Sequence, residues 1–124
     1  MTLENLDKLL TELQEDDRIK IVEGKRDQQA LEAFGIKNIR KIKGRLSTFM
    51  SRIKEEAMDV IVLTDHDTRG NQLAERLKEL AHHEGIKADL GYRKKLRMLS
   101  GVLEFEDLVS HYEEIKRKES KKTR

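Results

Sequence analysis

The sequence has no cysteine, no long apolar run and almost no net charge, and each lack excludes a class of protein. Without cysteine there is no disulfide, no thiolate zinc site and no cysteine nucleophile, and this composition fits a reducing cytoplasm. No stretch reaches the roughly 18 apolar residues of a membrane span. Residues 1–20 carry acidic side chains throughout, which excludes a secretory signal. We therefore expect a cytoplasmic protein without a membrane segment.

The small net charge limits what electrostatic attraction can do over long distances. Twenty-six Lys and Arg residues face 24 Asp and Glu residues, so the formal charge is only +2. Attraction to a nucleic acid then has to come from local patches rather than from the protein as a whole.

The length of 124 residues suits one domain and is too short for two independent cores. Although 40% of the residues are charged, the 36% that are apolar gather in blocks such as residues 60–63, which indicates a folded core. We predict one domain over residues 1–116, with a helix at its N-terminus and a helical extension at its C-terminus. The basic residues 117–124 are expected to form a disordered tail.

Strand and helix patterns alternate along the chain. Short β-branched or apolar runs predict strands at residues 18–22, 38–43, 59–64 and 86–90. Apolar residues at three- and four-residue steps predict helices before, between and after these strands. This alternation is typical of an α/β fold, so we predict a Rossmann-like, mainly parallel four-stranded sheet flanked by helices.

Acidic residues follow two of the predicted strands. Glu23 comes directly after the first strand, and Asp65 and Asp67 come directly after the third. Ligand sites of open parallel sheets lie at the carboxyl ends of strands, so the three carboxylates meet if these two strands are neighbours. At ~4 Å and an effective dielectric of about 20, each pair would repel by roughly 4 kcal/mol unless a cation or proton intervenes. Oxygen ligands favour Mg²⁺, with Mn²⁺ as the alternative, and such an ion suits phosphoryl chemistry.

Two of these segments resemble a known family. The segment IVEGKRD after the first strand and VIVLTDHDTRG at the third resemble the two signatures of the Toprim family, which includes primases, topoisomerases, ribosomal RNA maturases and nucleases. The resemblance covers about residues 18–90. The ending LGYRKKLRMLSG with FEDLVSHY is similar to small archaeal and bacterial stand-alone Toprim proteins. The resemblance implies a Toprim-like fold and Mg²⁺-dependent chemistry on a nucleic-acid phosphodiester.

The resemblance also assigns roles residue by residue. Glu23 takes the place of the family's glutamate, a general acid or base, while Asp65 and Asp67 take that of its metal-binding pair. We expect all three to be catalytic and to bind the metal. Gly24 and Gly70 occupy loop positions where the backbone is expected to turn tightly. These roles make a nuclease or a processing phosphotransferase our first hypothesis. We expect neither the tyrosine-bearing domain of topoisomerases nor the zinc module of primases here, and their lack favours the alternative of a non-catalytic binding module.

Basic residues near the predicted site are candidates for holding a nucleic acid. Lys25, Arg26 and Arg69 flank the acids and would bind substrate phosphate. A denser cluster would follow a nucleic-acid backbone and consists of Arg93, Lys94, Lys95 and Arg97. In so charged a chain, ordinary solvated surface explains these residues nearly as well.

Several alternatives stay open at this point. Asp67 or Thr68 can be a mere helix cap and Asp65 a turn residue. The same fold can also serve as a non-catalytic module that binds metal and nucleic acid, with a protein partner in a processing complex. A haloacid-dehalogenase-like phosphatase ranks third, because too few residues follow Asp67 to supply that family's second acidic motif. The choice between RNA and DNA, the bond attacked and the oligomeric state are open.

Overall fold

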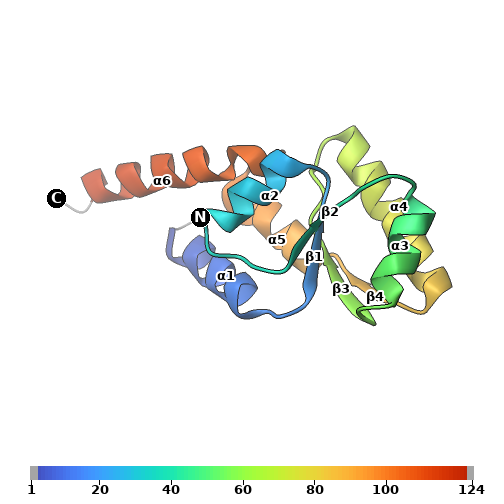
Figure 1. Cartoon of the computed structure of the whole chain (residues 1–124). Coiled ribbons are helices and arrows are strands. Elements are labelled where there is room, and N and C mark those ends of the chain that lie inside the picture. The colour runs from blue at the N-terminus through green and yellow to red at the C-terminus, as the bar shows by residue number, and fades with distance from the viewer. Residues whose placement is uncertain (1–2, 123–124) are drawn as a thin grey trace.

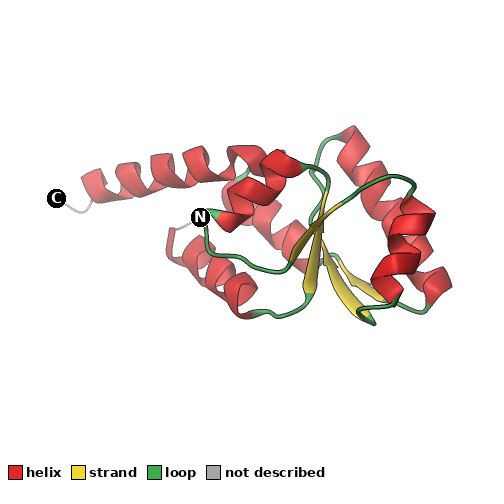
Figure 2. Ribbon diagram, in the orientation of Figure 1, coloured by secondary structure: helices red, strands yellow, loops and turns green. Residues whose placement is uncertain are grey.

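The structure is a computed structural model that describes residues 3–122 (Figures 1 and 2). In chain order its elements are α1 (Leu3–Glu15), β1 (Ile19–Val22), α2 (Lys25–Glu32), β2 (Ile39–Lys41), α3 (Leu46–Lys54), β3 (Asp59–Val62), α4 (Thr68–Glu84), β4 (Lys87–Asp89), α5 (Gly91–Ser100), the 3₁₀ helix η1 (Phe105–Asp107) and α6 (Leu108–Lys122). Within this part of the chain no helix has the length and apolar character needed to span a bilayer.

The four strands form one parallel sheet in the order β2-β1-β3-β4. This confirms the predicted α/β fold, and all four strands begin and end within two residues of their predicted bounds. After β1 the chain crosses to β2 on one side, and after β2 it passes β1 to reach β3 on the other side. The order therefore reverses between β1 and β3, which is where open α/β sheets bind ligands.

Alternate side chains of the strands enter two separate cores. Ile21 of β1 and Val62 of β3 pack with residues of α3 and α4. Val22 and Ile61 point to the opposite face and pack with residues of α1, α2, α5 and α6. Because both faces of the sheet are covered, as Figure 2 shows, burial in the central strands does not alternate: all of β1 and the last three residues of β3 are buried. The loops at the strand ends are left as the accessible part of the sheet.

The C-terminal extension is more ordered than the sequence predicts. A disordered tail was expected over residues 117–124, but α6 continues as a helix to the end of the described chain, and residues 123 and 124 lie outside the described part. Two contacts involve this part of the helix. Lys118 pairs with Glu114 one turn earlier at 3.1 Å, and the carboxylate of Glu119 accepts a hydrogen bond from the backbone N–H of Leu3 in α1 at 2.9 Å.

Candidate metal centre

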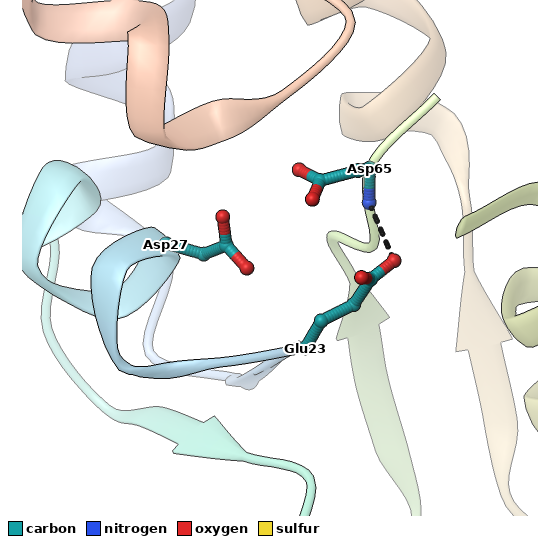
Figure 3. Close-up of side chains that lie close together, drawn as sticks. All are labelled: Glu23, Asp27 and Asp65. Atoms are coloured by element: carbon teal, nitrogen blue, oxygen red, sulfur yellow. Dashed lines mark hydrogen bonds between the residues drawn. The ribbon is translucent and has the colours of Figure 1, made fainter. Parts of the chain in front are cut away.

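Glu23 and Asp65 lie side by side because their strands are neighbours. In the β1–β3 pair, Ile21 is opposite Val62, and the backbone N–H of Leu63 continues the ladder to the carbonyl of Ile21 at 2.8 Å. Both strands then end in loops at the same edge of the sheet. There the Oε1 of Glu23 accepts a hydrogen bond from the backbone N–H of Asp65 at 3.2 Å (Figure 3). The strand adjacency that the predicted site requires is therefore present.

A third acid, Asp27, completes the cluster, and sequence reasoning assigned it no role. Asp27 lies in the first turn of α2, where its Oδ2 accepts a hydrogen bond from the backbone N–H of Gly24 at 3.2 Å. Carboxylate oxygens of Glu23, Asp27 and Asp65 all lie within 4.8 Å of one another, and Figure 3 shows the three groups turned toward one space. The signal available in the sequence was the four-residue spacing from Glu23 into the start of a helix.

Asp65 is held in place by the C-terminal extension. Its Oδ1 accepts a hydrogen bond from the backbone N–H of Phe105, at the start of η1, at 2.8 Å. The loop that carries Asp65 is anchored further by the N–H of His66, which donates to the carbonyl of Leu103 at 2.7 Å. Residues 103–107 thus orient the carboxylate of Asp65, which follows the carboxyl end of β3. The sequence of this segment did not indicate such a role.

The three carboxylates share an environment that opposes their negative charge. Burial, followed by the charges of neighbouring acids, raises the pKa of Asp27 and of Asp65 to about 6 and also raises the pKa of Glu23. Within residues 3–122 no Lys or Arg forms an ion pair with any of the three. A divalent cation would relieve this repulsion, and an all-oxygen donor set is the one Mg²⁺ and Mn²⁺ prefer, so the residues present fit such an ion.

Asp67, which the sequence placed with Glu23 and Asp65, does not belong to the cluster of three. It is the N-cap of α4, and its Oδ1 accepts a hydrogen bond from the backbone N–H of Gly70 at 2.7 Å. The structure thus adds Asp27 to the acids of the site, and metal binding by Asp67 stays a prediction. The negative charge of Asp67 still acts on the cluster, since it adds to the rise that burial causes in the pKa of Asp65.

The two loop glycines differ in what they require. Gly70 is buried at the start of α4, and a Cβ there would lie 1.9 Å from the carbonyl oxygen of Asp65 and 2.8 Å from the Oε1 of Glu23. Gly24 has an extended backbone with φ −146°, and a Cβ there would meet only Asp27, at 3.9 Å. The expectation of a tight turn therefore does not describe either residue. Gly70 is needed because α4 approaches the site loop closely, and Gly24 has no comparable constraint.

The basic residues predicted to bind substrate phosphate lie in the segments that carry the acids: Lys25 and Arg26 begin α2, and Arg69 lies in the first turn of α4. Lys25, Arg26 and Arg69 are exposed, and of these Arg26 makes a long ion pair with Glu106 at 3.8 Å. Arg69 is near enough for its charge to offset part of the rise in the pKa of Glu23 that burial causes. That these three residues bind substrate phosphate stays a prediction.

The prediction that Arg93 contacts a nucleic-acid backbone is wrong, because its side chain is buried under the site loop. Its guanidinium donates to the carbonyl oxygens of Thr64 and Asp65, at 2.9 and 2.6 Å, and to the Oδ1 of Asn71 at 2.6 Å. Arg93 thus fixes the segment between β3 and α4 from within. Of the other members of that cluster, Lys94 and Lys95 are exposed and Arg97 is half-buried, and their contact with a nucleic acid stays a prediction.

Removing the Arg93 side chain should destabilise the whole protein. We expect Arg93→Ala to lower the free energy of unfolding by about 3 kcal/mol, since several buried acceptors lose their donor. Lys94→Ala, one residue along the same helix and exposed, should change it by less than about 0.5 kcal/mol. Urea unfolding followed by circular dichroism measures both. Equal unfolding midpoints for the two variants would contradict the internal role of Arg93.

The raised pKa of Asp27 predicts that this acid destabilises the metal-free protein at neutral pH. A carboxyl group with a pKa of about 6 in the folded state binds its proton more tightly than in the unfolded chain, so stability is lost as the pH rises from about 4 through 6. We expect metal-free Asp27→Asn to be more stable than the wild type by about 2 kcal/mol at pH 7 and equally stable near pH 4. An Asn Oδ1 can still accept the hydrogen bond from Gly24.

Thermal and urea unfolding in EDTA at the two pH values tests this prediction. Comparing the variant with the wild type at the same pH cancels the contributions of titrating groups that do not interact with Asp27. The control is Asp17→Asn, an exposed position before β1 at the other end of the sheet, which should change stability by less than about 0.5 kcal/mol. If metal-free Asp27→Asn is less stable than the wild type at pH 7, the prediction is contradicted. The ionised carboxylate of Asp27 would then not destabilise the protein when no cation is bound.

Comparison with known proteins places this geometry in context. The Toprim domain family matches residues 18–99. A UPF0292 protein of Methanosarcina acetivorans is 38% identical over 124 residues, covering 96% of this chain and 85% of that protein. A UPF0292 protein of Methanocaldococcus jannaschii is 31% identical, and the match covers 87% of this chain and 92% of that protein. A solved structure of an Aquifex aeolicus protein matches with a TM-score of 0.76 at 30% identity, covering 82% of this chain and 96% of that one.

Proposed function

Since this chain belongs to the Toprim family, as a small member related to the UPF0292 proteins, we propose that it hydrolyses phosphodiester bonds of a nucleic acid with the help of a divalent metal. A Toprim domain implies a metal-dependent function connected with nucleic acids. The observation that supports the more specific proposal is the cluster of three carboxylates, drawn from the ends of β1 and β3 and the start of α2, none of which forms an ion pair within residues 3–122.

Each carboxylate has a position that suits a metal ligand. Glu23, Asp27 and Asp65 would hold Mg²⁺ or Mn²⁺, with Asp65 oriented by the N–H of Phe105 and Asp27 by the N–H of Gly24. When bound, such an ion supplies positive charge that polarises a phosphoryl oxygen and lowers the pKa of a coordinated water. The exposed Lys25, Arg26 and Arg69 would hold the remaining phosphate oxygens at the rim.

Glu23 is our candidate for the proton transfer, because it matches the glutamate that serves as general acid or base in the Toprim family and lies beside Asp65, with its Oε1 3.2 Å from the backbone nitrogen of Asp65. In hydrolysis a water oxygen forms a bond to phosphorus while the bond from phosphorus to the leaving oxygen breaks. Glu23 accepts the proton that water loses, and the leaving oxygen takes a proton from solvent.

One observation favours a second candidate, a module that binds metal and nucleic acid without turnover. Asp67, which matches the second acid of the family's metal-binding pair, is engaged in capping α4. The phosphatase alternative loses its basis, because the Toprim match includes the segment that suggested it.

A panel of labelled single-stranded and duplex RNA and DNA separates the two candidates. We expect product to form with Mg²⁺ or Mn²⁺ and none to form in EDTA. Salt-sensitive binding with no product from any substrate would favour the binding module. Cleavage that continues undiminished in EDTA would contradict both, because neither the reaction nor the binding would then involve a metal.

A further inference from the structure

The near-neutral net charge conceals a purely basic stretch of chain. Residues 33–54 contain no Asp or Glu and seven basic residues, which are Lys37, Arg40, Lys41, Lys43, Arg45, Arg52 and Lys54. The whole chain, in comparison, has a formal charge of only +2. The stretch includes β2, α3 and the connection between them. This stretch therefore carries an excess of positive charge. Whether these basic residues can contact a ligand depends on where they lie in the fold.

Part of this stretch lies at the same edge of the sheet as the acidic cluster. At the end of β2, Lys41 is opposite Val22, the residue before Glu23, and the N–H of Ile42 donates to the carbonyl of Val22 at 2.9 Å. The chain then leaves toward α3 from that edge, where β1 also leads into α2 and β3 into α4 (Figure 1). We call Lys41, Lys43 and Arg45, all three of them exposed, the basic edge.

The cations of the basic edge are not neutralised by the protein. In residues 3–122 none of them forms an ion pair, and the first turn of α3 contains no acidic residue. Two other cations of the same stretch are paired. Arg40 pairs with Glu56 at 2.7 Å, and Lys54 pairs with Glu84 at 3.7 Å. The three cations of the basic edge are thus among those of the stretch that form no ion pair.

The opposite flank of the cluster is acidic. Glu104 precedes η1, and Glu106 and Asp107 lie within it. η1 packs against α2, whereas the connection after β2 leads to α3, which covers the other face of the sheet (Figure 1). The charges of Glu104 and Glu106 reach the cluster, since they add to the rise that burial causes in the pKa of Asp27. A polyanion approaching the cluster is repelled on the η1 side and attracted on the side of the basic edge.

We propose that the basic edge binds the phosphate backbone of the nucleic acid whose reacting phosphate lies at Glu23, Asp27 and Asp65. This inference rests on the proposed function and adds the direction from which the strand reaches the site. It replaces α5 as the main contact surface, because Arg93 of that helix is buried. Lys and Arg side chains on phosphates recognise no bases, so binding through the basic edge is independent of sequence.

The test compares two triple variants of the same composition. One is Lys41→Gln, Lys43→Gln and Arg45→Gln, and the other, on α5, is Lys94→Gln, Lys95→Gln and Arg97→Gln. Both are made in the Asp65→Asn protein, which keeps the probe intact. Binding of fluorescein-labelled single-stranded RNA and DNA is followed by fluorescence anisotropy across a potassium chloride titration with Mg²⁺ present.

We expect the basic-edge variant to lose about tenfold or more in affinity and to lower the slope of log K against log salt by about 2, as three lost phosphate contacts on a single strand require. The α5 variant should keep both values. Equal losses in the two variants, an unchanged basic-edge variant, or no nucleic-acid binding by the parent protein would each overturn the proposal. Circular dichroism confirms that both variants are folded.

The same measurements keep this inference separate from the proposed function. If the wild type cleaves nucleic acid and loses that activity on Asp65→Asn, while the basic-edge variant binds normally, the function stands and the basic edge is rejected. If no cleavage is found but binding depends on the basic edge, the basic edge stands and the hydrolytic function is rejected.

Discussion

The Asp65→Asn protein will be folded but will have lost metal-dependent cleavage by about a hundredfold or more, since one charged ligand of the cluster is gone. The fold should be kept because an Asn Oδ1 can still accept the hydrogen bond that Phe105 donates to Asp65. The loss is measured on the RNA or DNA that the wild type cleaves best, with Mg²⁺ and Mn²⁺ compared.

The matched control for this variant is Asp17→Asn, which makes the same chemical change at an exposed position at the other end of the sheet. It should retain full activity. Urea unfolding of both proteins shows whether a loss of activity reflects a loss of structure. Full activity of Asp65→Asn would mean that the carboxylate cluster is not the reaction centre.

Gly70→Ala will be among the most destabilising single changes in this protein, although it adds only one methyl group. The new Cβ would lie 1.9 Å from the carbonyl oxygen of Asp65, which is backbone and cannot move aside like the end of a flexible side chain. Either α4 or the loop carrying Asp65 must shift. We expect the free energy of unfolding to fall by about 3 kcal/mol or more, the upper range for overpacking a close contact.

Gly24→Ala is the control for this effect, because its Cβ would approach nothing closer than 3.9 Å and its backbone suits any residue. It should change the stability by less than about 1 kcal/mol. Thermal unfolding of both variants measures the difference. A Gly70→Ala protein as stable as Gly24→Ala would show that α4 does not approach the site loop as closely as the structure has it.

Much of the fold and two of the three clustered acids could be predicted from the sequence, for physical reasons. Short β-branched runs alternating with amphipathic segments leave little choice but a parallel sheet covered on both faces. Since parallel strands end at one edge, Glu23 and Asp65 had to meet once β1 and β3 were neighbours. Those inferences depend on backbone topology, which periodicity encodes directly.

The remaining features depend on how helices pack, which periodicity does not encode. Asp27 and Asp67 both lie at helix starts, and only the packing of α2 and α4 decides which acid joins the cluster and which one caps a helix. Arg93 stands among basic neighbours, so its sequence context looks like solvated surface. The docking of α5 buries that one side chain under the β3–α4 loop. The hydrogen bond from Phe105 to Asp65 likewise depends on where the C-terminal extension packs.

The account is tested most directly by soaking crystals of the wild-type protein in Mn²⁺ and recording anomalous scattering at the manganese edge. It predicts an anomalous peak between the carboxylates of Glu23, Asp27 and Asp65, bonded to oxygens of all three. A manganese ion bound elsewhere with that space empty, or no bound ion at Mn²⁺ concentrations that support activity, would contradict it.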